Sequence, residues 1–173
     1  SADSLLTTDH VRYISPDSNG KFFPGNKLTK AKAAQMIYNL LAEKPAEKTW
    51  CKDVTESTTN GTAIGTLLYL GVASANDDGY FYPTKNITKG ELQAMLDKAL
   101  GKEPSASGST ATITRGAAVR LINQALGRDK TDQNTILKGD RIRPFTDVVT
   151  TSTYYYDIME ASIGHVSDIA EDG

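Results

Sequence analysis

Three Thr–cation pairs in the sequence have the residue types of an anion-binding site, and each follows an aliphatic residue: Thr29-Lys30, Thr88-Lys89 and Thr114-Arg115. The N–H groups at a helix start carry partial positive charge, and an added cation makes such a start suitable for an anion. A cation there is otherwise unfavourable by about 0.3–1 kcal/mol. We therefore expect Lys30, Lys89 and Arg115 to meet an anionic ligand. The alternative is that each is a solvated side chain that tolerates its position.

An amphipathic helix is predicted behind each pair. Apolar residues recur there at steps of three and four, which gives each helix one apolar stripe: Met36, Ile37, Leu40 and Leu41; Met95, Leu96, Ala99 and Leu100; Leu121, Ile122, Ala125 and Leu126. The Thr of each pair is a helix N-cap, and Thr88 with Glu91 forms a capping box. Three stripes that face one another predict a central three-helix bundle, with shorter helices at 62–70 and 154–163 outside it.

Two further segments repeat along the chain. Residues 19–24 and 78–83 each combine a Gly, aromatic residues and a Pro ahead of a predicted long helix. Such a turn uses Gly for positive φ, aromatics as anchors and Pro to prevent helix. The third copy has a Ser-rich segment at 105–110 instead. Residues 51–54 and 145–148 are the other repeat, in which Asp53 and Asp147 are equivalent and are expected to stabilise turns.

The chain has 173 residues, of which 39% are hydrophobic and 23% are charged. These fractions are typical of a globular protein. A net charge of −2 argues against general nucleic-acid binding, which usually needs a dominant basic face. No run approaches the roughly 18 apolar residues of a membrane span. The N-terminus shows no signal peptide, so the chain is either cytosolic or a trimmed piece of an exported protein.

Residues for catalysis or metal binding are sparse. The single cysteine, Cys51, excludes an intramolecular disulfide and is expected to be a small core residue. We find no phosphate-binding glycine loop, no metal-spaced His/Cys set and no Ser–His–Asp arrangement. The carboxylate pairs Asp77-Asp78 and Asp157 with Glu160 are typical of surface or capping groups. No catalytic residue, cofactor or metal is therefore expected, and the chain is not predicted to be an enzyme.

The order of these segments resembles the S-layer homology (SLH) domain family, in the degenerate three-repeat form of clostridial surface proteins. The likeness covers roughly residues 11–166. It is carried by residues 51–54, by the stretch from Gly71 to Pro83 and by the three Thr–cation segments. Residues 145–166 resemble the closing unit of such proteins. It implies an all-α, pseudo-threefold bundle with three long central helices, short peripheral helices and turn loops. We expect one SLH-type domain over 1–173, in units 1–48, 49–103 and 104–173, the last including the closing short helix.

The resemblance also implies a function and a place. Family members are secreted, lie at the wall of Gram-positive-type cells, and bind secondary cell-wall polysaccharide that often carries a pyruvate ketal, in grooves between the prongs of the bundle. By position, Lys30, Lys89 and Arg115 would meet the anionic sugar, and Asp53 and Asp147 would shape the groove. The expected function is a non-catalytic module that anchors a protein to this polysaccharide, without nucleic-acid binding or membrane insertion.

Departures from the family pattern keep a second function open. Lys replaces the Arg of the T-R-A-E motif twice, and its Glu is replaced by Lys32 and Ala117. The Trp at the start of the short helix is missing, since Thr59 and Thr153 fall near that position. These changes favour a degenerate SLH fold that serves protein–protein assembly, with self-association in a surface layer or scaffold.

Overall fold

The computed structural model of the chain describes residues 9–10, 13, 20–104, 108–127 and 165–166. This part contains four α-helices and one pair of two-residue strands, so the expected all-α class is confirmed. The chain divides into two compact units, one of residues 1–5 and 27–113 and the other of residues 6–26 and 114–173. The pseudo-threefold arrangement and the three sequence units stay predictions.

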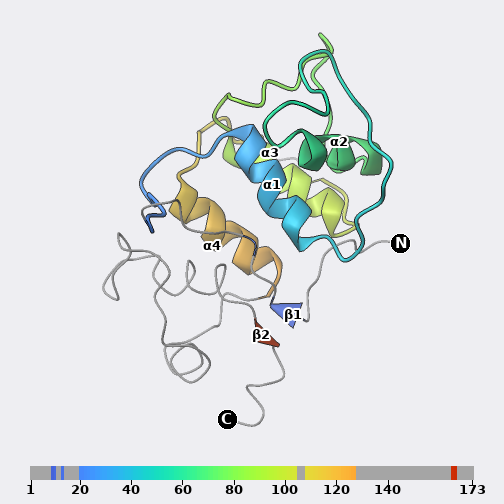
Figure 1. The fold of residues 1–173 in the computed structure, drawn as a ribbon. Helices are drawn as coiled ribbons and strands as arrows, with labels where there is room; N and C mark the ends of the chain where they lie inside the picture. The colour runs from blue at the N-terminus through green and yellow to red at the C-terminus, as the bar shows by residue number, and fades with distance from the viewer. Residues whose placement is uncertain (1–8, 11–12, 14–19, 105–107, 128–164, 167–173) are drawn as a thin grey trace, which may run out of the picture. The chain divides into compact units, whose positions relative to one another are not determined.

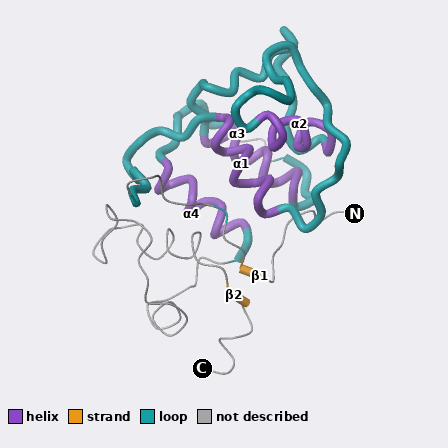
Figure 2. The backbone as a smooth tube through the Cα atoms, in the orientation of Figure 1, coloured by secondary structure: helices purple, strands orange, loops and turns teal. Residues whose placement is uncertain are grey.

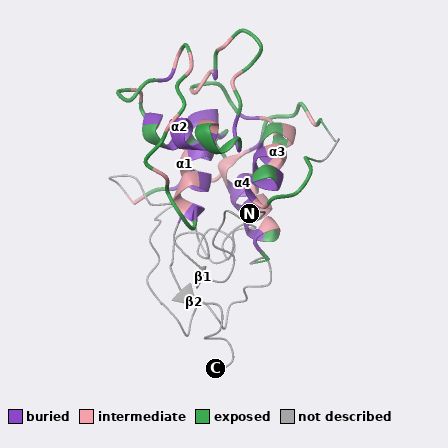
Figure 3. Cartoon of the chain, turned by 90° about the vertical axis from the view of Figure 1, so that its right-hand side faces the viewer, coloured by how far each residue is buried: buried purple, intermediate pink, exposed green. Residues whose placement is uncertain are grey.

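The first unit holds helices α1 (Lys30–Leu40), α2 (Gly61–Leu70) and α3 (Lys89–Ala99). Helix α1 contacts both α2 and α3 (Figure 1), and long loops join the three helices (Figure 2). Helix α2 is buried on most sides from Gly61 to Leu67, and α3 carries exposed residues along one side (Figure 3). The short helix expected at 62–70 is confirmed and begins one residue earlier, at Gly61.

The apolar stripes supply the core of this unit. Fully burying a Leu or Ile side chain contributes about 1.5–3 kcal/mol to the free energy of unfolding, and the buried side chains from the three helices include Ala34, Ile37, Leu40, Ile64, Leu67, Leu92 and Leu96. Leu100, at the end of its predicted stripe, is only half-buried. Leu121 and Ala125 of the third predicted stripe are half-buried too, so the stripes predict the core correctly except at these three residues.

The second unit holds helix α4 (Arg115–Ala125) and strands β1 (Asp9–His10) and β2 (His165–Val166), which pair antiparallel. A buried polar contact ties residue 13 to α4. The Tyr13 hydroxyl donates to Asn123 Oδ1 at 2.6 Å, and both side chains are almost fully buried. This bond satisfies two groups that would otherwise be costly to bury. The short helix expected at 154–163 lies outside the described residues.

Cys51 differs from its expected place in the core. It is half-buried, and its Sγ atom donates to Asp53 Oδ1 at 3.3 Å. Burial, followed by this hydrogen bond, raises the pKa of the Cys51 thiol. Asp53 holds the thiol at the edge of a turn, so Cys51 does not enter the core. Among the described residues, no helix is long and apolar enough to span a membrane.

Candidate functional site

Helices α1, α3 and α4 each begin against a loop segment through the same pair of backbone hydrogen bonds. The first N–H of the helix donates to one loop carbonyl, and the second N–H donates to the carbonyl two residues earlier. The pairs are Lys30 to Lys85 (2.8 Å) and Ala31 to Pro83 (2.9 Å); Lys89 to Ala111 (2.8 Å) and Gly90 to Ser109 (3.0 Å); Arg115 to Asn26 (2.7 Å) and Gly116 to Pro24 (2.9 Å). The first two of these starts lie in the first unit and the third in the second unit.

The predicted Thr caps take the third N–H of each helix. Thr29, Thr88 and Thr114 accept from the N–H three residues later at 3.1–3.2 Å. The capping box is also confirmed, since the Thr88 N–H donates to Glu91 Oε1 at 2.9 Å. The first three N–H donors of every start are therefore satisfied within the protein. Any anion contact at these starts consequently falls to the side-chain cations and not to the helix backbone.

The three cations differ in how much of their charge faces solvent, and Lys30 is the most enclosed. Its side chain is 6% exposed, and its Nζ atom lies 4.5 Å above the centre of the Phe81 ring. The same Nζ lies 3.8 Å from Glu91 Oε2. Glu91 is 44% exposed, so water screens this ion pair and the desolvated cation–π contact is the stronger of the two. Lys30 is therefore used inside the fold.

Arg115 repeats this arrangement in the second unit. Its guanidinium carbon lies 4.8 Å from the centre of the Phe22 ring, and its Nε–H donates to the Phe22 carbonyl at 2.9 Å. Phe22 and Phe81 occupy equivalent places in the two aromatic turns, and both are buried. The expected anchoring role of the turn aromatics is confirmed for these two residues. Arg115 itself is half-buried.

Lys89 is the exposed member of the set. Its helix start docks on residues 109–111, the copy that lacks aromatic residues, so no ring covers the side chain. Within the described ranges, no ion pair or cation–π contact involves Lys89. The sequence difference in the third copy thus explains why this cation remains open to solvent.

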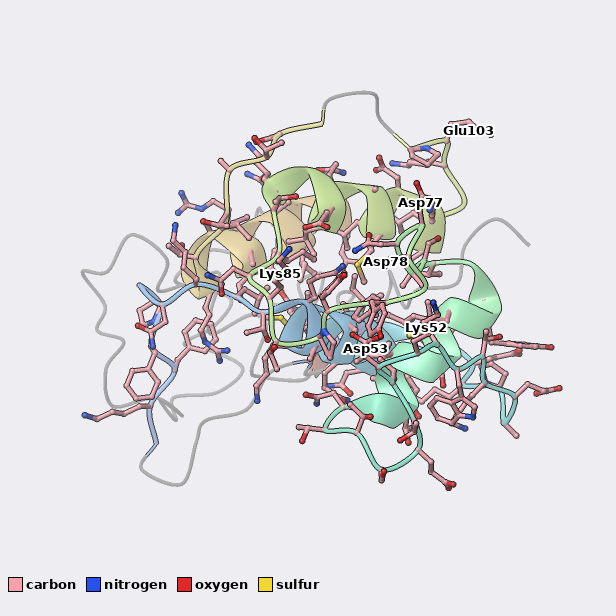
Figure 4. All side chains as sticks on the ribbon, turned by 90° about the horizontal axis from the view of Figure 1, so that it is seen from above. Lys52, Asp53, Asp77, Asp78, Lys85 and Glu103 are labelled. Carbon is pink, nitrogen blue, oxygen red and sulfur yellow. The ribbon has the colours of Figure 1, made fainter. Side chains whose placement is uncertain are left out.

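Asp53 fixes the second aromatic turn. Its Oδ1 accepts from the Phe81 N–H and its Oδ2 from the Tyr82 N–H, both at 2.8 Å, and Figure 4 shows it beside that loop. Burial, the largest influence, raises the pKa of Asp53, but these N–H donors together hold that pKa below its ordinary value. The predicted turn-stabilising role is confirmed. Asp147, its sequence equivalent, lies outside the described residues.

Sequence reasoning missed Trp50 and Tyr69, and Tyr80, expected to help anchor its turn, is exposed. Trp50, Tyr69 and Tyr80 are 41%, 47% and 39% exposed. The Trp50 ring lies against Gly65 of α2, where an added Cβ would come within 2.7 Å of it. A single aromatic residue in a loop or at a helix end carries no periodic signal, although Tyr80 was visible in the motif Tyr80-Phe81-Tyr82. In the described part of the chain, His, Cys, Asp and Glu side chains form no group of three suited to a metal ion.

Comparison with known proteins agrees with these motifs. Residues 52–92, which span Asp53, helix α2, the aromatic turn and the start of α3, match the family model of the S-layer homology domain. A cellulosome-anchoring protein of Acetivibrio thermocellus is 26% identical over 211 aligned residues, covering 96% of this chain and 45% of that protein. The chain thus spans about half the length of this curated relative. The resemblance to the S-layer homology family expected from the sequence is therefore supported by the match over residues 52–92 and by this relative.

Proposed function

We propose that this chain is a non-catalytic module that holds a protein at the outer cell surface by binding anionic secondary cell-wall polysaccharide. The observation that carries this proposal is the repeated helix start, which presents a cation at the same backbone position in α1, α3 and α4. The match to the S-layer homology domain and the relative named for anchoring support it.

The cations have different roles in this proposal. Lys89 is exposed and makes the direct ion pair with an acidic group of the polymer, such as a pyruvate ketal. Arg115 contributes from its half-buried position, where stacking on Phe22 orients the guanidinium. Lys30 holds the aromatic turn in place through Phe81 and Glu91. Asp53 shapes the loop, and Asp147 is assigned the same role by its position in the repeat.

Binding to purified wall polysaccharide tests the proposal. The wild-type chain should be retained, and Lys89→Gln should weaken binding about fivefold, as expected for the loss of about 1 kcal/mol from one exposed charged contact. Lys98→Gln is the matched control, because Lys98 is also an exposed lysine on α3. Absence of wild-type binding would reject the anchoring function, while equal effects of both variants would reject Lys89 as a contact.

One observation favours assembly with a second copy of this chain as another candidate function. Trp50 and Tyr69 lie on the same face of α2, because the Trp50 ring contacts Gly65 and Tyr69 follows Gly65 by one helical turn. Both are largely exposed, and exposed aromatics are enriched in protein interfaces. Sedimentation without polysaccharide should then show self-association that Trp50→Ala abolishes. A monomer at all concentrations would exclude this function.

A further inference from the structure

The second aromatic turn presents two tyrosines and two lysines on the surface of the first unit. The rings of Tyr80 and Tyr82 stack with their centroids 5.7 Å apart and an interplanar angle of 26°. Lys52 Nζ lies 5.6 Å from the centre of the Tyr80 ring, and Lys85 Nζ lies 5.0 Å from that of Tyr82. We call these four residues the tyrosine platform. It is distinct from the helix-start cations.

The backbone of Tyr82 is in a conformation that disfavours a bulky residue. Its φ is 62°, in the left-handed region, although it precedes Pro83 and carries a large side chain. Phe23 has the equivalent place in the first turn, with φ of 59° ahead of Pro24. Gly or Asn would fit this conformation at lower cost. An aromatic residue is therefore kept at this position in two turns despite local strain.

Burial does not account for these aromatic residues. Phe23 is 42% exposed and Tyr80 is 39% exposed, and Tyr82 is only partly covered. The neighbouring Phe22 and Phe81 already fill the buried anchoring positions of the two turns. Strained residues that the core does not need are typical of binding sites.

The platform is held rigidly. Asp53 accepts the Tyr82 N–H, and the Tyr82 hydroxyl donates to Asp78. The Lys52 N–H donates to the Gly79 carbonyl at 3.0 Å, and its aliphatic chain lies so close to Gly79 that a Cβ there would be 2.9 Å from Lys52 Cε. Such preorganisation lowers the entropy lost when a ligand binds.

The charges of the platform suit an anion. In the described part of the chain, neither Lys52 nor Lys85 forms an ion pair within 4.0 Å. The nearby carboxylates of Asp53 and Asp78 are instead occupied by hydrogen bonds from the loop itself. Lys52 attracts Asp78 only from beyond ion-pair distance, so both ammonium groups can pair with an external carboxylate beside the aromatic surface.

We propose that the tyrosine platform binds an acidic sugar residue. Its apolar C–H groups would rest on the exposed parts of Tyr80 and Tyr82, and its carboxylate would pair with Lys52 and Lys85. Sugars combine apolar C–H faces with polar edges, which matches an aromatic surface bordered by cations. This inference rests on the proposed function, because the same wall polymer supplies the sugar, and it adds a contact area beyond Lys89.

Calorimetric titration with purified acidic wall polysaccharide tests the platform. Tyr82→Asn relieves the strain of the left-handed backbone but removes the hydrogen bond to Asp78, so its thermal midpoint should stay close to that of wild type while affinity falls about tenfold. The Lys52→Gln/Lys85→Gln double variant should lose affinity to a similar degree, about tenfold. Tyr38→Ser is the matched control, because Tyr38 is a half-buried tyrosine of α1 that also has a lysine, Lys44, near its ring, and it should bind as wild type does.

Each result decides between the claims. If wild type binds and the platform variants bind equally well, the platform is refuted while the anchoring function stands. If wild type does not bind, both are refuted. If the polymer binds with equal affinity after its carboxylates are removed, the acidic-sugar assignment is refuted. If a polyglutamate peptide competes for the platform and acidic sugar does not, the platform is a peptide site instead.

Discussion

Replacing Asp53 by Ala should strongly destabilise the second aromatic turn of the first unit. The carboxylate accepts two backbone N–H groups at 2.8 Å, one on each oxygen. Hydrogen bonds to a charged group contribute about 1.5–3 kcal/mol each, and the partial exposure of Asp53 reduces this value. We therefore expect a loss of about 2–4 kcal/mol in the free energy of unfolding for Asp53→Ala, and about half of that for Asp53→Asn, which keeps one acceptor.

Urea denaturation followed by circular dichroism measures this loss. Asp77→Ala is the control, because Asp77 is an exposed acid near the same turn, and it should change stability by less than about 0.5 kcal/mol. Hydrogen exchange should also speed up at the amides of Phe81 and Tyr82 in Asp53→Ala. An Asp53→Ala variant as stable as the Asp77→Ala control, with both amides still protected, would refute the reasoning.

Three further predictions concern stability. Thr88→Ala should cost about 1 kcal/mol in thermal or urea unfolding, because it removes a side-chain cap of α3. Gly65→Ala should lower the free energy of unfolding by about 1–3 kcal/mol, because the new Cβ would meet the ring of Trp50. The fluorescence emission of Trp50, the single tryptophan, should shift as well, and unchanged emission would contradict this contact. The pKa of Asp53 is lowered in the folded chain, and the Tyr82 hydroxyl lowers the pKa of Asp78 in the same way. The stabilisation from both carboxylates is therefore complete above their unfolded-state pKa near 3.9, and it is lost as the pH falls through their folded-state pKa values. Melting curves from pH 6 to pH 2.5 should show this loss, and Asp53→Asn should reduce it.

Local sequence patterns predicted the parts of the fold that depend on local chemistry. Thr29, Thr88 and Thr114 cap their helices because a cap needs only the neighbouring backbone. The apolar stripes placed the buried faces because helical periodicity is itself a local property. The Ser-rich third copy, predicted to lack the aromatic turn, is the segment against which α3 begins, and the helix-start cation of α3, Lys89, is exposed.

Other features depend on contacts between distant segments, which a single sequence does not reveal. Lys30 and Lys89 both follow a helix-capping Thr, yet Lys30 is buried because Phe81 and Glu91 come to it from later in the chain. The satisfied N–H groups at each helix start depend on loops paired with them in the same way. The left-handed backbone of Tyr82 could not be foreseen, because most residues before Pro are extended.

The central claim is that one of the equivalent helix starts remains open to an anion while another is used internally. A nuclear magnetic resonance titration of the labelled chain with wall polysaccharide tests it most directly. The account predicts shifts in the side-chain signals of Lys89, and none in those of Lys30, whose ammonium group stays between Phe81 and Glu91. Shifts at Lys30 without shifts at Lys89 would contradict it.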